Sequence, residues 1–314
     1  MVEIFKTNIE TGTLEEATQI EKGAWINLVN PSKEEIDKLC TNLDINVIFA
    51  TYLLDYEERA RVDIEDTQKL IVVDVPIVED ENDTHHYITT PLFMLNINDE
   101  VFITSSCSDL ELIKSFKQGK VKEFYTYKRT RFVLQIIYAN SMNFLKHIRN
   151  ISKDIDNIEN KLQKHLENEE ILKMLSISKS LVYFSTSLKS NEAVMERLLR
   201  GRIMRLFEED EDILEDAIIE NKQAIEMTKI HTDILNSATE TYSSLISNNL
   251  NNVMKFLASV TIVLSLPTII ASLFGMNVTL PVSANDPMSF VYILALSILI
   301  CAITCVWLKM KNLL

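Results

Sequence analysis

The sequence predicts an α+β domain, then a region of long helices, and finally two membrane-spanning helices. Three observations carry this prediction. Residues 1–127 alternate helical patterns with short runs rich in Val, Ile, Thr and Phe. Residues 128–252 contain no proline and follow a helical period. Two apolar runs without any charged residue, 256–274 and 288–308, lie near the C-terminus.

The first region predicts helices grouped around an antiparallel sheet. Residues 24–28 predict a strand, and Ser32 followed by Glu35 is the capping box of a helix. Further helices are predicted over 46–56 and 109–117. The runs rich in β-branched residues are separated by polar breaks typical of antiparallel hairpins. These predicted strands are 69–77, 87–97 and 100–105. Helices around an antiparallel sheet define an α+β domain.

The second region predicts two or three long helices. A seam of apolar residues recurs at alternating spacings of 3 and 4, as in a coiled coil. The seam consists of Ile148, Ile151, Ile155, Ile158 and Leu162. Polar breaks near 167–170 and 199–202 separate the helices. The last begins near Glu208 and meets no breaker until Pro267, so it is about 65 residues and about 100 Å long. Without a partner in its own chain, such a helix is expected to pack against copies of itself.

Each apolar run is about 20 residues long, which matches a hydrocarbon core of about 30 Å. A pair of buried helices in a soluble core is the alternative, but charge-free runs of this length are rare there. Lys255 precedes the first run, while Lys309 and Lys311 lie in a short basic tail, 309–314. The loop 275–287 has no Lys or Arg, and the N-terminus lacks a signal-peptide pattern. The positive-inside rule then places both termini in the cytoplasm of a cell-membrane protein.

The charge balance excludes several function classes. With 45 acidic and 31 basic residues, the formal charge is −14, which argues against nucleic-acid binding and favours attraction of cations. Lysines between 114 and 122 form only a small basic patch. The four cysteines form no disulfide framework, and His85 and His86 fit surface histidines better than a metal site. Motifs of phosphate-binding loops, zinc proteases and serine hydrolases are absent, so no enzyme and no organic cofactor are expected.

A stripe of small and hydroxylated residues follows the first apolar run at spacings of 3, 4, 3 and 4. It consists of Ala258, Thr261, Ser265, Thr268 and Ser272, and it extends back to Asn251 and Met254 and forward to Asn277. In hydrocarbon such a stripe faces protein or water. One reading is helix packing, with hydroxyls bonded to their own i−4 carbonyls. The other is a pore that suits an ion keeping its water shell, as Mg²⁺ does.

The tripeptide Gly275-Met276-Asn277 follows this run directly. Gly275 can adopt a helix-capping conformation closed to other residues. Asn277 then offers an amide carbonyl at the mouth of the stripe. A ring of such carbonyls, one per subunit, can accept hydrogen bonds from the water shell of a cation.

These features together resemble the CorA family of divalent-cation channels. The matching pieces are this tripeptide, the two spans, the segment 252–255, and Pro267 ten residues before Asn277. Residues 25–28 and 58–63 resemble two upstream family segments, so the resemblance covers nearly the whole chain. It implies an α/β/α cytosolic domain and a funnel-shaped homopentamer whose first span lines a pore. It also implies uptake of Mg²⁺, with Co²⁺ and Ni²⁺ as further candidate substrates.

The resemblance also assigns roles to individual residues. Gly275, Met276 and Asn277 match the mouth, and Asn277 the position that contacts the hydrated ion. The pore-facing positions are Asn251, Met254, Leu257, Thr261, Ser265 and Thr268. Met254 and Leu257 would form a hydrophobic constriction that gates by dewetting. Ser265 stands where some members carry Met, and Phe274 replaces the commoner Tyr.

The family's regulatory site pairs carboxylates of neighbouring subunits around Mg²⁺, which holds the pore shut. Asp216 matches the long-helix position, and Glu240 matches a lower acidic position. Tyr52 stands where an Asp is expected, so Asp55 is the candidate substitute. The acidic run 208–216 equally fits a solvated helix N-terminus favoured by the macrodipole.

Two alternative functions stay open at this point. One is a proton-coupled Zn²⁺ transporter of the same fold, although Gly-Met-Asn favours Mg²⁺ by resemblance. The other is a membrane-tethered oligomeric sensor or scaffold, which needs no polar stripe.

Overall fold

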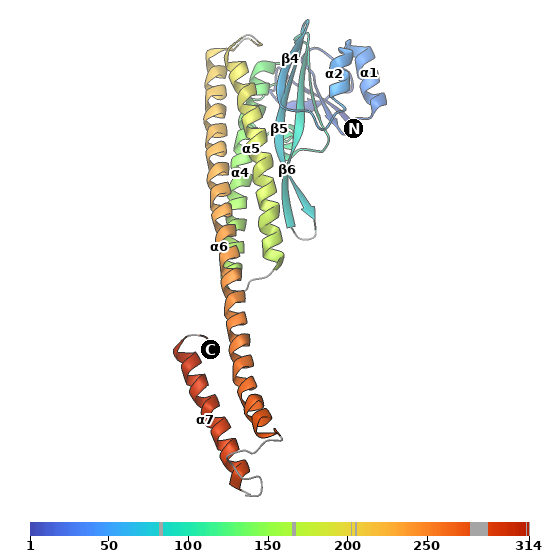
Figure 1. The fold of residues 1–314 in the computed structure, drawn as a ribbon. Coiled ribbons are helices and arrows are strands. Elements are labelled where there is room, and N and C mark those ends of the chain that lie inside the picture. Colours follow the sequence, from blue (N-terminus) through green and yellow to red (C-terminus); the bar gives the residue numbers. More distant parts are fainter. Residues whose placement is uncertain are drawn as a thin grey trace. The chain divides into compact units, whose positions relative to one another are not determined.

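The computed structural model describes residues 1–81, 84–164, 168–201, 203–204, 206–276, 288–311 and 313. It divides into two compact units, Met1–Ser237 and Ala238–Leu314, and each is described by itself. The elements, most of them labelled in Figure 1, are β1 (Val2–Thr7), β2 (Leu14–Glu16), β3 (Trp25–Val29), α1 (Lys33–Leu43), α2 (Val47–Tyr52), β4 (Arg61–Glu65), β5 (Gln68–Glu81), β6 (Thr84–Ile97), β7 (Val101–Ser106), α3 (Glu111–Lys117), α4 (Arg129–Lys164), α5 (Asn168–Leu199), α6 (Glu208–Phe274) and α7 (Met288–Met310).

Within the described residues, seven strands form one sheet in the order β2-β1-β3-β7-β6-β5-β4. The hairpins β5–β6 and β6–β7 are antiparallel, as predicted. The prediction of a purely antiparallel sheet is wrong at one pair, because β3 and β7 are parallel. Parallel strands need a long crossover, and here α1, α2 and three further strands separate the two in sequence. The short strands β1, β2 and β4 were not predicted.

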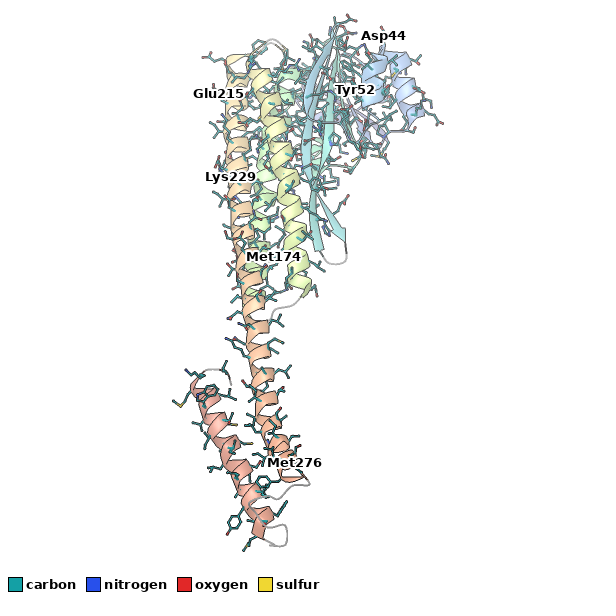
Figure 2. The ribbon with its side chains drawn as sticks, in the orientation of Figure 1. Asp44, Tyr52, Met174, Glu215, Lys229 and Met276 are labelled. Atoms are coloured by element: carbon teal, nitrogen blue, oxygen red, sulfur yellow. The ribbon has the colours of Figure 1, made fainter. Side chains whose placement is uncertain are left out.

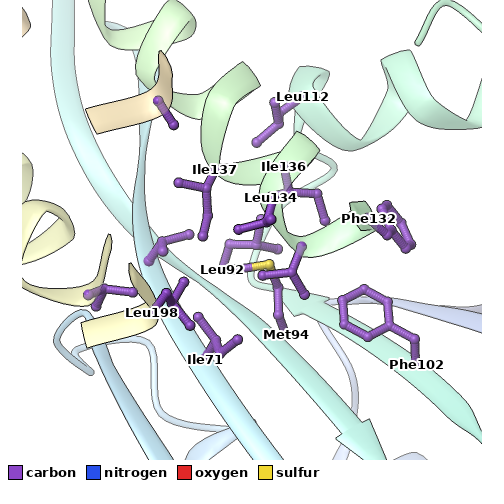
Figure 3. Packing of buried hydrophobic residues seen from close by; sticks show 14 of the residues in the cluster. Ile71, Leu92, Met94, Phe102, Leu112, Phe132, Leu134, Ile136, Ile137 and Leu198 are labelled. Atoms are coloured by element: carbon purple, nitrogen blue, oxygen red, sulfur yellow. The ribbon is translucent and has the colours of Figure 1, made fainter. Parts of the chain in front are cut away.

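The sheet lies between two helical layers, so the unit has the expected α/β/α architecture (Figure 1). Successive side chains of a strand point to opposite faces. Trp25 accordingly joins the core beneath α4 and α5, while Ile26 joins the core beneath α1 and α2. Figure 3 shows part of the first core, which includes Met94 and the rings of Phe102 and Phe132, whose centroids lie 4.8 Å apart. The indole of Trp25 is fully buried and its N–H donates to Thr104 Oγ1 at 2.8 Å.

The predicted capping box is confirmed. The Glu35 N–H donates to Ser32 Oγ at 3.2 Å, and the Ser32 N–H donates to Glu35 Oε2 at 2.9 Å. These two bonds satisfy backbone donors that an α-helix leaves free at its start. The second helix, α2, is shorter than predicted and ends at Tyr52.

The long helices are confirmed, and all five residues of the predicted seam are buried in α4. At 67 residues, α6 is close to the predicted length. The expectation that it lacks a partner in its own chain is wrong for its first part. Leu214, Ala217 and Ala224 are buried, and Asn221 Nδ2 donates to the Leu188 carbonyl of α5 at 3.0 Å. The longest stretch of α6 without a buried side chain runs from residue 243 to 258.

Asp74 of β5 joins both long helices to the sheet. Its N–H donates to Asn191 Oδ1, and its carbonyl accepts from Asn140 and Asn191, each at 2.8 Å. Burial raises the pKa of the Asp74 carboxyl to about 6, although Ser187 and Arg59 favour the ionised form. The ionised carboxylate therefore costs stability at neutral pH.

We expect Asp74→Asn to stabilise the protein at pH 7 by up to about 3 kcal/mol, since one pKa unit corresponds to about 1.36 kcal/mol. A raised carboxyl pKa favours folding at low pH, and this contribution is lost as the pH rises from about 4 through about 6. The advantage of the variant should therefore disappear towards pH 4. Denaturant unfolding followed by Trp25 fluorescence measures the difference.

The pH dependence must be measured as the difference in the free energy of unfolding between the variant and the wild type. His147 contributes a pH dependence of the opposite direction to both proteins, and this contribution cancels in the difference. Burial lowers its pKa to about 4, so its contribution to stability is lost as the pH falls below about 6.5. An advantage of Asp74→Asn that stays constant between pH 4 and pH 7 would contradict the assignment.

Candidate pore and regulatory residues

Among the described residues, α6 and α7 are the helices long and apolar enough to cross a membrane. Their most apolar stretches are almost wholly exposed. A continuous exposed apolar surface of this size is unfavourable in water. Its length instead matches the hydrocarbon core of a bilayer.

The predicted polar stripe lies on the exposed surface of α6. Asn251, Thr261, Ser265 and Thr268 are all exposed, and Met254 and Leu257 each have 57% of their surface exposed. The hydroxyl groups donate to carbonyls one turn earlier. Thr261 Oγ1 bonds to Leu257 O at 2.8 Å, Ser265 Oγ to Thr261 O at 2.7 Å, and Thr268 Oγ1 to Leu264 O at 3.3 Å.

These bonds determine what the stripe can offer to a ligand. A hydroxyl has one hydrogen to donate and two lone pairs that accept. Because the hydrogen is used within the helix, the oxygen remains available as an acceptor. The stripe can therefore accept hydrogen bonds from water molecules, including those of a hydrated cation.

A different face of α6 contacts α7 and the residues after it. Ser259 is 2% exposed and its hydroxyl donates to the Leu313 carbonyl at 2.7 Å. Ile270 and, on α7, Leu308 are buried as well. Cys301 Sγ of α7 donates to the Val263 carbonyl at 3.8 Å.

This contact also accommodates Pro267 inside α6. Proline has no N–H, so the Val263 carbonyl loses its usual partner one turn later. In lipid a freed carbonyl needs a neighbouring helix to satisfy it. The Cys301 thiol fills this role.

The α7 face and the stripe lie on opposite sides of α6. At about 100° per residue, Thr261 and Val263 project about 200° apart. The stripe is therefore not used for packing against the chain's own second span. The i−4 hydroxyl bonds that the helix-packing reading expects are present, so packing of the stripe against another copy stays open beside the pore reading.

The mouth tripeptide is described only in part. The Gly275 N–H donates to Ala271 O at 3.0 Å, and Met276 is 53% exposed. Gly275 does not adopt the predicted left-handed capping conformation. A Cβ at this position would lie 3.3 Å from the Ala271 carbonyl oxygen, a contact that a shift of a few tenths of an ångström would relieve. Asn277 lies outside the described residues.

The proposed regulatory carboxylates are all exposed: Asp55, Asp216 and Glu240. Asp55 Oδ1 accepts a hydrogen bond from the Glu57 N–H at 2.9 Å. Figure 2 labels Tyr52 at the end of α2 and Glu215 on α6, on opposite sides of the layered unit. Among the described residues, no group of three or more His, Cys, Asp or Glu is placed so that it could hold a metal ion. A site joining Asp55 to Asp216 would therefore need two chains.

Tyr52 has a partner that sequence reasoning missed. The Arg61 guanidinium lies over the Tyr52 ring, 4.3 Å from its centroid. Arg61 also forms ion pairs with Glu58 and with Asp63, and these hydrogen bonds raise the pKa of the guanidinium. The position that the family resemblance reserves for an Asp is thus occupied by an arginine–tyrosine stack flanked by two carboxylates. In the sequence, the close spacing of Glu58, Arg61 and Asp63 is the signal that could have indicated this charged cluster.

The family model of "CorA-like Mg2+ transporter protein" matches residues 21–310. The chain belongs to this family. A curated relative, the "Cobalt/magnesium transport protein CorA" of Methanocaldococcus jannaschii, is 27% identical over 285 residues, covering 88% of this chain and 86% of its own length.

Solved structures agree on the fold. The complete structure of the CorA magnesium transporter from Methanocaldococcus jannaschii matches with a TM-score of 0.83 at 23% identity, covering 98% of this chain and 97% of that one. A full-length CmaX protein matches with a TM-score of 0.72 at 15% identity, covering 99% and 96%. The layered unit, the long helices and the two apolar helices are thus a fold that CorA shares.

Oxidative cross-linking in the membrane can test whether the stripe and the α7 contact lie on opposite faces of α6. With the other three native cysteines replaced by Ala, Val263→Cys should form a disulfide with Cys301 of the same chain, because the two residues lie at one helix contact. Thr261→Cys is the matched control and should not. Peptide mass spectrometry identifies the pairs. Equal coupling of both variants to Cys301 would contradict the assignment of faces.

Proposed function

We propose that this protein is a homopentameric channel of the cell membrane that mediates Mg²⁺ uptake, with Co²⁺ and Ni²⁺ as further substrates. The exposed hydroxyl stripe of α6, opposite the face that contacts α7, carries the proposal. Membership of the family and the cobalt and magnesium named for its curated relative support the choice of ions. Five copies of α6 would surround the pore, each turning its stripe inward.

The chemistry of the stripe favours a hydrated ion. Mg²⁺ dehydrates reluctantly and usually keeps several waters. Hydroxyl oxygens, whose hydrogens are used within the helix, accept hydrogen bonds from those waters without replacing them. Zn²⁺ prefers nitrogen and sulfur ligands, and the stripe residues include neither His nor Cys.

In the proposed arrangement across the membrane, the segments follow one another in chain order. A cytosolic domain, 1–127, and a long-helix region, 128–252, precede the first span, 253–274. The loop 275–287 lies outside, the second span is 288–308, and the tail 309–314 returns to the cytoplasm. The membrane potential contributes about 2.3 kcal/mol per charge per 100 mV. A divalent cation can therefore enter without nucleotide hydrolysis.

Selection and gating are assigned to two levels of the pore. Asn277 would form a ring of amide carbonyls that binds the water shell at the mouth, with Gly275 and Met276 shaping the loop. Deeper in the pore, Met254 and Leu257 lie three residues apart and both are exposed in the single chain. Five copies of each would form a hydrophobic constriction that closes by dewetting.

Regulation is assigned to carboxylates that meet between chains. Bound Mg²⁺ would bridge Asp216 of one chain and Asp55 of the next, with Glu240 as a further site. Mg²⁺ loss would leave like charges facing each other and loosen the closed ring. The Arg61–Tyr52 stack supplies a cation beside this interface, which weakens the need for metal there.

Asn277→Ala should abolish Mg²⁺ entry into liposomes, because the mouth loses the acceptors that hold the hydrated ion. Asn252→Ala is the matched control. Asn252 precedes Thr261 by nine residues, which at about 100° per residue places it on the opposite side of α6. A fluorescent Mg²⁺ indicator inside the liposomes reports flux.

Unchanged flux in Asn277→Ala would reject the mouth assignment. The same liposomes should be tested with Mg²⁺, Co²⁺, Ni²⁺ and Zn²⁺, with and without a pH gradient. Zn²⁺ flux that requires the gradient would favour the proton-coupled alternative. Absence of flux for every ion would favour the sensor or scaffold.

Asp216→Ala should weaken closure by internal Mg²⁺, because one carboxylate of the bridging pair is lost. Tyr52→Asp should strengthen it, since it restores the expected carboxylate and removes the ring stacked on Arg61. The Mg²⁺ dose response of channel closure, recorded in lipid bilayers, measures both shifts. Overlapping curves for both variants and wild type would rule out this regulatory assignment.

A further inference from the structure

A basic groove lies between α3 and α4, apart from every residue assigned above. Its volume is about 450 Å³. Lys114 and Lys120 line one wall, from α3 and the turn after it, and Lys146 and Arg149 line the other, from α4. We call the groove that these four residues line the basic groove. Leu112 and Met142 contribute apolar surface to its lining, and Leu112 of α3 is labelled near α4 in Figure 3.

The charges of the groove differ from those of the whole chain. Four cationic side chains line it against one carboxylate, Glu111, while the chain as a whole carries −14. Lys114 pairs with Glu111 at 2.9 Å and with Asp109 at 3.4 Å. The groove thus concentrates positive charge on an acidic protein.

Three of the four cationic side chains are not paired with an acidic group among the described residues. Within the described part of the chain, Lys120, Lys146 and Arg149 form no ion pair, and all three are exposed. The amides of Gln118 and Asn143 add neutral hydrogen-bond donors to the same lining. Like charges facing one another across a groove repel, and an anion between them would relieve this repulsion.

Phosphate chemistry fits this arrangement best. Lysine and arginine bind phosphate oxygens through charge-assisted hydrogen bonds, and a concave surface focuses the field of its charges. Cations on both walls would contact successive phosphates of a chain. The acidic run 208–216 of a second copy is the competing occupant. However, it belongs to a helix about 10–12 Å wide with its side chains, which is large for a groove of this volume.

We propose that the basic groove binds a polyphosphate anion, supplied either by a nucleoside triphosphate or by inorganic polyphosphate. The cations of α3 and α4 would hold successive phosphates from opposite sides, and Gln118 and Asn143 would donate to the remaining oxygens. The site is independent of the proposed channel function, because none of its residues belongs to the pore or to the proposed regulatory carboxylates.

Binding to the full-length assembled protein in detergent tests the proposal. The probes are inorganic tripolyphosphate, ATP and AMP, in EDTA, at an ionic strength where the Debye length is about 8 Å. Calorimetry should show saturable binding of tripolyphosphate and ATP, and much weaker binding of AMP. Equal affinities for the first two identify the phosphate chain as the recognised group. Tighter binding of ATP shows that the nucleoside is recognised too.

The variant Lys146→Ala/Arg149→Ala should weaken polyphosphate binding by about tenfold or more. Lys179→Ala/Lys189→Ala removes the same number of exposed charges from α5 and should bind as the wild type does. Absent binding, equal losses in both variants, or equal affinity for AMP would overturn the proposal. Dissociation of the oligomer in the groove variant alone would instead show that a second copy occupies the groove. The readout is binding, so failure of ion flux would not affect it.

Discussion

The first span is a single helix whose surface must suit both hydrocarbon and a polar surrounding of protein or water. In hydrocarbon every backbone polar group needs an internal partner, and polar side chains are tolerated only against protein or water. The chain meets both requirements by dividing the surface of α6. One face contacts α7 and its following residues through Ser259 and Val263 and includes the buried Ile270, and the opposite face carries the hydroxyl stripe. The polar face therefore has no use within a single chain, which is the physical reason to expect several chains.

The layered unit anchors the other end of the same helix. Trp25 and its aromatic neighbours pack against one face of the sheet. Asp74 ties α4 and α5 to β5 through three hydrogen bonds between its backbone and the side-chain amides of Asn140 and Asn191. Buried contacts of Leu214 and Ala217 then hold the start of α6. After residue 242 the helix has no buried side chain until Ser259.

Much of this could be predicted from the sequence, because the signals are local. The capping box of Ser32 and Glu35, the seam of α4 and the start of α6 at Glu208 each follow from neighbouring residues. The parallel pairing of β3 with β7 depends on contacts between residues about 75 positions apart, which no local pattern encodes. The Arg61–Tyr52 stack joins residues only nine positions apart, but it depends on how the end of α2 meets the start of β4, which neither a helical nor a strand period encodes. Gly275 was expected to be required for its backbone angles, but it does not adopt a left-handed conformation.

The central claim is that the stripe of α6 faces water while the face on α7 does not. Single cysteines at 261, 265 and 268, and at 259, 263 and 270, compare the two faces in a background without native cysteines. A charged, membrane-impermeant thiol reagent applied to the protein in lipid vesicles reports which positions contact water. The account predicts fast modification at Thr261, Ser265 and Thr268 and slow modification at the other three. Protection of all six positions, or faster reaction on the face that contacts α7, would contradict it.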